Sequence, residues 1–318
     1  MIDESAFEES ALLFDCHGSR LIGVMAKPLG VVKQAVLIVV GGPQYRVGSH
    51  RQFVLLSRRM AECGIASLRF DYRGMGDSEG QPIDFLRIAD DIECAIAQLY
   101  REVPNLSGII IWGLCDAASA ALTYAYRDAR VVGLVLLNPW VRSAESEARA
   151  YVKHYYRQRV LQLEFWKKFV GGNINWGSSL SSIATYISRM IMGIWPLKKS
   201  SNGSVADGLG AVGESQLADQ MASGFDRFSG PVLFALSGND LVAAEFRELA
   251  SRSIQWRRLM KRDAVTVKEV PGATHTFSSE TWRSDVAEST VEWILSQNFS
   301  PQGTSSSTGN AGGRRLEL

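Results

Sequence analysis

The sequence predicts an α/β protein with a mainly parallel β-sheet and helices on both of its faces. Two observations lead to this class. Short runs of β-branched and other apolar residues, such as "AVLIVV" at 35–40, alternate with segments of helical periodicity, such as 49–63. The alternation stops after residue 139 and resumes near residue 231, which indicates that one core is interrupted by an insertion.

Composition fits this class and excludes several kinds of partner. The chain has 318 residues, and its net charge of +1 gives no reason to expect a nucleic acid or an anionic membrane surface. No run approaches the roughly 18 apolar residues of a membrane span, and the acidic N-terminus lacks the apolar region of a secretory signal. Cys16, Cys63, Cys94 and Cys115 form no CxxC pair and no spacing typical of zinc sites. We therefore expect a cytoplasmic protein with free thiols and no integral membrane segment.

The first part of the chain supplies most of the predicted core. Phe53, Leu56 and Met60 lie on one stripe of the first helix, which Gly64 ends. Strands are expected at 11–16, 21–28, 35–40, 66–70, 108–112 and 131–139, the first two as a hairpin, and helices at 49–63, 83–101 and 116–126.

The second part contains the insertion. Residues 140–229 show no strong strand pattern, and we expect them to form a helical cap after the sixth core strand. Because open α/β sheets bind ligands at the carboxyl ends of their strands, a cap at this point is expected to cover that edge. Further strands are expected at 231–238 and 265–270, and helices at 242–261 and 281–297. The predicted domains are a core of 1–139 and 230–298, a cap of 140–229 and a disordered tail of 299–318.

A cysteine lies in a strand-to-helix turn, within Gly113-Leu114-Cys115-Asp116-Ala117. Small residues two positions before and after a nucleophile are typical of a nucleophile elbow. The sharp turn lifts the side chain off the sheet and places it at a helix N-terminus, where the positive end of the helix dipole favours a thiolate. The alternative is a small apolar side chain packed in the turn, since cysteine is among the most buried residue types.

A catalytic thiol needs a base, and the base needs a carboxylate that orients it. Asp240 follows the predicted strand "PVLFALSGN", and His275 follows "VTVKEVPGAT". Both residues therefore come just after late strands, where they are expected to meet Cys115. For Asp240 the alternative role is the N-cap of the next helix. For His275 it is a solvated loop position at the start of the last helix.

Five motifs, "GGPQYR", "DYRGMGDSEG", "GLCDAASAA", "SGND" and "GATH", follow one another in an order that resembles the α/β-hydrolases. The resemblance covers residues 10–139 and 230–298 and includes the chain order of nucleophile, acid and histidine. More narrowly, "GGPQYRVGSHRQF" with "WGLCDAASAAL" resembles the hydrolases that accompany exosortase A systems in bacterial exopolysaccharide and PEP-CTERM gene clusters. This resemblance implies an α/β-hydrolase fold and a cytoplasmic bacterial hydrolase.

Two positions depart from the pattern of these relatives. Most relatives carry serine where this chain has Cys115, although cysteine nucleophiles occur in enzymes similar to dienelactone hydrolase, and a thiol suits esters, thioesters and lactones. One oxyanion donor is expected to be the Asp116 N–H. The second normally comes from the loop in which this chain has Pro43, which has no N–H. We therefore expect Gln44 to donate, through its backbone N–H or its side-chain amide.

Other residues near these motifs are weaker candidates for substrate contact. Gly42 lies in the oxyanion loop, and Arg46 beside it is either a surface charge or a clamp for an anionic substrate. Tyr155 belongs to the predicted cap, where it is expected to pack on the core, to shape an acyl or glycosyl pocket, or both. The glycines of "DYRGMGDSEG" are expected to shape a turn rather than to bind phosphate, and Asp71 and Asp77 are expected to be structural.

Together these residues predict covalent acyl transfer. His275, oriented by Asp240, takes the proton of Cys115, the thiolate attacks a carbonyl carbon, and the acyl group passes to water. The predicted activity is hydrolysis of an ester or thioester, which the resemblance links to exopolysaccharide biosynthesis. The alternatives are acyl transfer to a sugar hydroxyl and a non-catalytic binding protein on the same fold. A redox role is disfavoured, because no cysteine adjacent in sequence is there to resolve an oxidised Cys115.

The expected partner is a small molecule, or a lipid or glycan that carries an acyl group. The mechanism implies no metal and no organic cofactor. The sequence leaves the natural substrate and the oligomeric state open.

Overall fold

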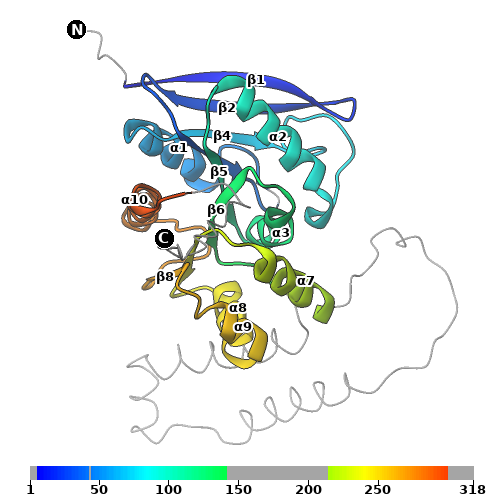
Figure 1. Ribbon diagram of the computed structural model, residues 1–318, viewed down its shortest axis with the longest axis vertical. Coiled ribbons are helices and arrows are strands. Elements are labelled where there is room, and N and C mark those ends of the chain that lie inside the picture. The colour runs from blue at the N-terminus through cyan, green and yellow to red at the C-terminus, as the bar shows by residue number, and fades with distance from the viewer. Residues whose placement is uncertain (1–5, 43, 142–213, 300–318) are drawn as a thin grey trace, which may run out of the picture. The chain divides into compact units, whose positions relative to one another are not determined.

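The computed structural model describes residues 6–42, 44–141 and 214–299. Within these residues eight strands form one sheet in the order β1-β2-β4-β3-β5-β6-β7-β8 (Figure 1). β1 with β2 and β2 with β4 pair antiparallel, and all other neighbours pair parallel. The strands are β1 (Phe7–Cys16), β2 (Ser19–Pro28), β3 (Gln34–Val39), β4 (Ala66–Asp71), β5 (Gly108–Leu114), β6 (Val131–Leu137), β7 (Val232–Ser237) and β8 (Val265–Val270).

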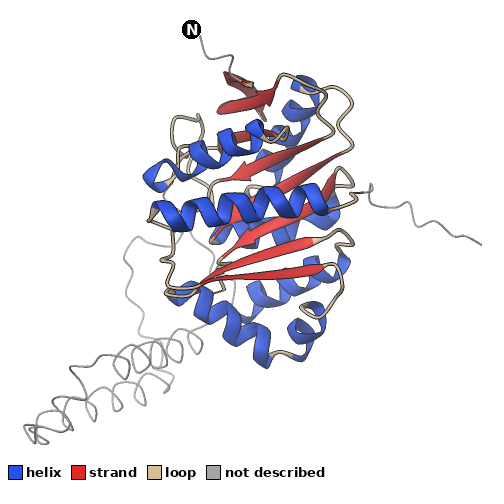
Figure 2. Ribbon diagram, turned by 90° about the vertical axis from the view of Figure 1, so that its left-hand side faces the viewer, coloured by secondary structure: helices blue, strands red, loops and turns tan. Residues whose placement is uncertain are grey.

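Helices cover both faces of the sheet (Figure 2). One face packs against α1 and α10, and the other against α2, α3, α7, α8 and α9. Along β3, Val36 and Ile38 lie in the core under α1 and α10, whereas Leu37 and Val39 lie in the core on the opposite face. This alternation is expected for a strand buried on both faces. The helices are α1 (Gln52–Glu62), α2 (Ala89–Glu102), α3 (Asp116–Tyr124), α7 (Glu214–Arg227), α8 (Leu241–Arg252), α9 (Ile254–Leu259) and α10 (Glu280–Ser296).

The predicted class of a mainly parallel α/β sheet is confirmed, and some predicted helix bounds are wrong. The helix expected over 242–261 is two helices, α8 and α9. Ser253 between them is extended, and its side chain caps α9 by accepting a hydrogen bond from the Trp256 N–H. The helix expected from residue 83 begins at Ala89, because the preceding residues form a single 3₁₀ turn capped by Asp84.

Helix α7 lies inside the range predicted for the cap. Its side chains Met221 and Phe225 are fully buried in the core that α3 shares, and α7 belongs to the same compact unit as the sheet. The rest of the predicted cap, 142–213, and the predicted tail from residue 300 lie outside the described residues. The division into core and cap therefore stays a prediction.

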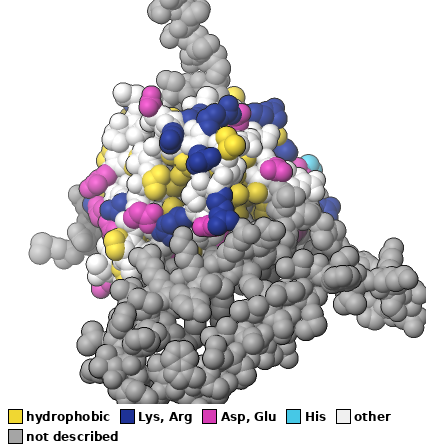
Figure 3. Space-filling view, turned by 90° about the horizontal axis from the view of Figure 1, so that it is seen from below, with side chains coloured by type: hydrophobic (Ala, Val, Ile, Leu, Met, Phe, Trp, Pro, Cys, Tyr) yellow, Lys and Arg dark blue, Asp and Glu magenta, His cyan; other side chains and the backbone are white. Residues whose placement is uncertain are grey.

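The described residues bear on the predictions about membrane spans, surface charge and cysteines. None of its helices joins the length and the apolarity that a membrane crossing requires. On the coloured part of the face at the bottom of Figure 1, basic, acidic and hydrophobic side chains are intermixed (Figure 3). All four cysteines are free thiols, as predicted. The cytoplasmic location stays a prediction.

Candidate active site

Cys115 lies at the tight turn between β5 and α3. Its backbone is left-handed, with φ 63° and ψ −124°, a conformation that is rare for a residue with a side chain. The turn is held on both sides: the Cys115 N–H donates to the Leu137 carbonyl at 2.9 Å, and the Cys115 carbonyl accepts from the Trp140 N–H at 3.2 Å. The thiol is half-buried at the N-terminus of α3 and makes no capping hydrogen bond to the helix. The strand-turn-helix geometry expected of an elbow is therefore present at Cys115.

The small residues around Cys115 have a direct steric cause. A Cβ atom at Gly113 would lie 2.8 Å from the Ala117 carbonyl, because α3 passes directly over the end of β5. A Cβ atom at Gly41, in the neighbouring loop, would lie 2.3 Å from the Leu114 oxygen. Ala117 is itself fully buried, so that a larger side chain there has no room. These contacts explain the spacing that identified the elbow.

Asp240 and His275 meet beyond the ends of β7 and β8. The Asp240 Oδ2 atom lies 2.9 Å from His275 Nδ1. The same carboxylate caps α8, since it accepts from the Ala243 N–H at 3.1 Å and from the Val242 N–H at 3.4 Å. The Asp240 carboxylate therefore contacts the imidazole and caps α8 at the same time. Its side chain is only 6% exposed, which keeps water from competing for the imidazole.

His275 also contacts the elbow, through a hydrogen bond with the Cys115 side chain. Burial alone lowers the pKa of an imidazole, but the bonds to Asp240 and to Cys115 outweigh burial and raise the pKa of His275 to about 10. At neutral pH the imidazole is therefore protonated and faces the sulfur as a cation. This arrangement favours a thiolate–imidazolium pair, the activated form of a cysteine nucleophile.

A buried asparagine, which the sequence analysis missed, supports the loop that carries His275. Asn138 Nδ2 donates to the His275 carbonyl at 3.0 Å and to Ser237 Oγ at 2.8 Å, and its Oδ1 accepts from the Ser237 N–H at 2.8 Å. Ser237 Oγ in turn donates to the Thr274 carbonyl at 3.0 Å. The sequence carried a signal for Asn138 in "VLLNPW", where a polar residue follows a predicted buried strand.

The oxyanion loop is tied to the elbow by a second group that was missed, the carboxylate of Asp116. It accepts from the Gly42 N–H at 2.7 and 2.9 Å and from the Ala117 N–H at 2.9 Å. Burial raises the pKa of Asp116, although the backbone N–H groups of Gly42, Ala117 and Asp116 itself partly offset this effect. The Gly42 N–H is occupied by this bond, so Gly42 shapes the loop and its N–H is not free for a substrate. Pro43 lies outside the described residues.

The side chain of Gln44 makes contacts that distinguish its two predicted oxyanion donors, the backbone N–H and the side-chain amide. Its side-chain oxygen accepts from the Ser49 N–H at 3.3 Å and from Gln52 Nε2 at 3.4 Å. The carboxamide is thereby directed toward the start of α1. The backbone N–H of Gln44 is therefore a better candidate for an oxyanion donor than its side chain.

Arg46, expected to be a surface charge or a substrate clamp, is engaged with two aspartates. Its guanidinium forms ion pairs with Asp71 and with Asp77, the latter at 2.7 Å, and its backbone N–H donates to Asp71 Oδ1 at 2.6 Å. Asp71 is fully buried, so the arginine charge is needed to compensate it. The structural role expected of the two aspartates is confirmed, and Arg46 belongs to the same framework. Tyr155, the remaining substrate candidate, lies outside the described residues.

Comparison with known protein families covers the elbow but not the whole site. The family described as serine aminopeptidase, S33, matches residues 32–185. This segment contains Cys115 and ends before Asp240 and His275, and the family's name specifies a serine enzyme.

Two curated proteins are similar over part of their length. A polyketide transferase from Penicillium is 31% identical over 113 residues, which are 34% of this chain and 36% of that protein. The quorum-quenching protein AidA of Acinetobacter baumannii is 30% identical over 135 residues, 40% of this chain and 42% of that protein. The chain thus matches less than half the length of either protein.

Among solved structures, an esterase from Pyrococcus furiosus matches 93% of this chain and 95% of its own with a TM-score of 0.59. At 13% sequence identity this similarity concerns the fold.

Proposed function

From the α/β-hydrolase fold of this chain, we propose that it hydrolyses an ester or a thioester through Cys115, His275 and Asp240. One observation carries the proposal: the elbow thiol faces an imidazole whose pKa is raised to about 10 by a buried carboxylate 2.9 Å away. A thiol that served only as an apolar side chain would have no need of such a neighbour.

The first half of the reaction forms an acyl-enzyme. The Cys115 thiolate attacks the carbonyl carbon, a C–S bond forms, and the carbonyl electron pair moves onto oxygen. The Asp116 and Gln44 N–H groups stabilise this oxyanion. When the electron pair returns, the bond to the leaving group breaks, and the His275 imidazolium gives its proton to the departing oxygen or sulfur.

The second half releases the acid. His275, now neutral, takes a proton from a water molecule, whose oxygen attacks the thioester carbon. The C–S bond then breaks, and the sulfur leaves as a thiolate beside the newly formed imidazolium. Asp240 holds Nδ1 of the ring throughout, so that the other ring nitrogen faces the sulfur. The cycle consumes one water and needs no metal or organic cofactor.

The acceptor can also be a hydroxyl group, and this is the second candidate function. The similarity to a polyketide transferase favours it, because that protein's name specifies group transfer. Its acceptor would take the place of water in the second half, with the same residues in the same roles. The resemblance to hydrolases of exopolysaccharide clusters supports an acylated saccharide, a lipid-linked intermediate or an acyl thioester as the natural substrate, in the cytoplasm.

The test is turnover of p-nitrophenyl acetate and of an acyl thioester, together with iodoacetamide labelling of Cys115. We expect Cys115→Ala and His275→Ala each to lower turnover by about 1,000-fold or more. Labelling of Cys115 should slow in His275→Ala. Cys63→Ala is the matched control, since Cys63 is also a half-buried free thiol but ends α1.

Turnover by the unaltered chain no greater than that of Cys115→Ala, with labelling as slow as that of Cys63, would overturn the proposal in favour of a binding protein. Adding a sugar alcohol as acceptor separates the two enzymatic candidates. Accumulation of its acyl ester in place of the free acid identifies a transferase.

A further inference from the structure

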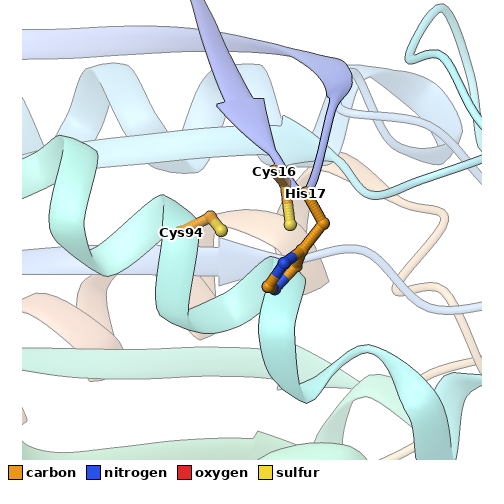
Figure 4. A group of neighbouring side chains, drawn as sticks. All are labelled: Cys16, His17 and Cys94. Carbon is orange, nitrogen blue, oxygen red and sulfur yellow. The ribbon is translucent and has the colours of Figure 1, made fainter.

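Two thiols and an imidazole come together far from Cys115, at the edge of the sheet. Cys16 is the last residue of β1, His17 begins the turn into β2, and Cys94 lies in α2 (Figure 4). The two Sγ atoms and a ring nitrogen of His17 all lie within 4.8 Å of one another. Cys94 points from the helix toward Cys16 (Figure 4). We call these three residues the hairpin cluster.

The backbone of the turn explains how two consecutive residues share this space. Neighbouring side chains of an extended strand point to opposite faces. His17 has a left-handed φ of 51° and is followed by Gly18 at 82°, so the alternation is broken at this position. The Gly18 N–H donates to Asp15 Oδ1 at 3.3 Å, which helps to hold the turn. The imidazole is thereby placed on the same side as the Cys16 thiol.

The charges around the hairpin cluster favour a cation. His17 Nε2 lies 3.8 Å from the Asp90 carboxylate, and the carboxylate of Asp91 acts on both thiols. Arg73 is the cation nearby, and it is paired with Asp91 at 2.9 Å and with Asp90 at 3.4 Å. Two carboxylates thus face one guanidinium, which leaves a negative balance around the sulfurs.

We propose that Cys16, Cys94 and His17 bind a zinc ion, with Asp90 or a water molecule in the fourth position. Two sulfurs and one imidazole nitrogen are the donors that zinc prefers, and sulfur ligands disfavour magnesium and calcium. Ligand atoms of a tetrahedral zinc site lie about 3.5 Å apart. Since no pair of these atoms is more than 4.8 Å apart, a contraction of at most about 1.3 Å is needed, and the exposed side chain of His17 can rotate toward the two sulfurs.

Binding exchanges protons for the metal. A thiol binds zinc as a thiolate, so each cysteine gives up its proton on binding. Zinc forms two S–Zn bonds and one N–Zn bond, two S–H bonds break, and two protons pass to the solvent. The ion then joins the β1–β2 hairpin to α2 as a cross-link. Since β1 is an edge strand and Cys115 follows the central strand β5, this site is independent of the proposed acyl transfer.

The test is equilibrium binding of Zn²⁺ to the full chain, with Co²⁺ as a spectroscopic probe for thiolate ligands. We expect one Zn²⁺ per chain at this site, and sulfur-to-cobalt charge-transfer absorption. Cys94→Ser and His17→Asn should each weaken binding by about 100-fold. Asn tolerates the left-handed turn, and Cys94 is only half-buried, so both variants are expected to fold.

Two control variants separate this site from other thiols. Cys63→Ser and Cys115→Ala should keep the ion and the charge-transfer absorption, and an unchanged far-ultraviolet circular dichroism spectrum confirms folding of every variant. Zinc bound equally well by Cys94→Ser and His17→Asn would overturn the proposal. So would an ion lost only in Cys115→Ala, which would place the metal at the candidate active site.

Discussion

The described residues contain two groupings of cysteine and histidine, and the charges around their thiols are opposite in sign. At the elbow, one thiol lies on a strained turn at a helix N-terminus and faces an imidazole that Asp240 keeps protonated. In the hairpin cluster, two thiols are packed under a turn, their pKa values are raised, and the imidazole is exposed. A cationic neighbour suits a nucleophile, whereas anionic neighbours and a second sulfur suit a metal. The surroundings of a thiol, rather than its identity, decide its chemistry.

Beyond the removal of Cys115 or His275 themselves, the largest expected effect is that of removing the charge that orients His275. Asp240→Asn should lower acyl turnover by about 10,000-fold, because the amide no longer stabilises the imidazolium. The pKa of His275 should fall toward its ordinary value, so that the alkaline limit of activity moves to lower pH. A pH–rate profile checks both effects. A profile with the same alkaline limit as the unaltered chain would contradict the comparison.

The carboxylate of Asp116 is the next test, since it ties the oxyanion loop to the elbow. Asp116→Ala removes the acceptor that holds the Gly42 N–H, so the loop that carries Gln44 should shift. If the Gln44 N–H is thereby lost as an oxyanion donor, kcat should fall by about 100-fold, the effect typical of losing one such donor. Asp116→Asn is the matched variant, because its side-chain oxygen can still accept from the Gly42 N–H, and it should retain most of the activity. Equal losses in the two variants would show that the charge matters and the loop position does not.

The support that Asn138 gives to the His275 loop can be tested through the free energy of unfolding. Asn138→Gly keeps the left-handed backbone at φ 43° but leaves the buried Ser237 N–H without its acceptor. The free energy of unfolding should fall by about 1–3 kcal/mol, the typical effect of one unsatisfied buried group. Urea denaturation measures this change. Gln297→Gly, near the C-terminal end of α10, is the control and should change stability by less than about 0.5 kcal/mol.

The protonation of His275 also couples stability to pH. Its folded pKa of about 10 lies above the usual 6.5, so the imidazolium stabilises the folded state. This contribution is fully present below pH 6.5 and is lost as the pH rises through about 10. The difference in free energy of unfolding between the unaltered chain and His275→Gln should therefore shrink over that interval. A constant difference would contradict the raised pKa.

The smallest expected effect is that of the hairpin cluster on acyl turnover. A large effect would contradict the view that the two groupings are separate. Cys94→Ser should leave acyl turnover within about twofold of the unaltered chain, because distant sites act independently. Saturating zinc should raise the melting temperature of the unaltered chain but not that of Cys94→Ser. Loss of turnover in Cys94→Ser would mean that the two groupings are one functional unit.

Much of the fold was predictable, because the patterns that define it are local. Runs such as "AVLIVV" and "GIIIW" predicted strands buried on both faces, and β3 and β5 lie there. The helix expected over 242–261 was wrong for an equally local reason, since Ser253 ends one helix and caps the next. That capping signal was present in the sequence and was outweighed by the helical periodicity around it.

The candidate site was predicted in part. Cys115, Asp240 and His275 were found because each follows a strand, and parallel strands bring their carboxyl ends to one edge. The ion pairs of Arg46 were not foreseen, because nothing in its neighbours along the chain shows that it lies against the buried Asp71. The Asp116 carboxylate was missed for the same reason, whereas Asn138 left a local signal that was overlooked, a polar residue at the end of the apolar run "VLL".

By itself, the sequence determined the alternation of strands and helices, the elbow and the order of the catalytic candidates, since these depend on residues a few positions apart. Only the tertiary structure decided which distant side chains share one space. Cys16 and Cys94 show this most clearly: no spacing in the chain links them, and they meet because α2 packs against the β1–β2 hairpin. Contacts between sheet edge and helix depend on strand order and packing, which no local pattern of residues encodes.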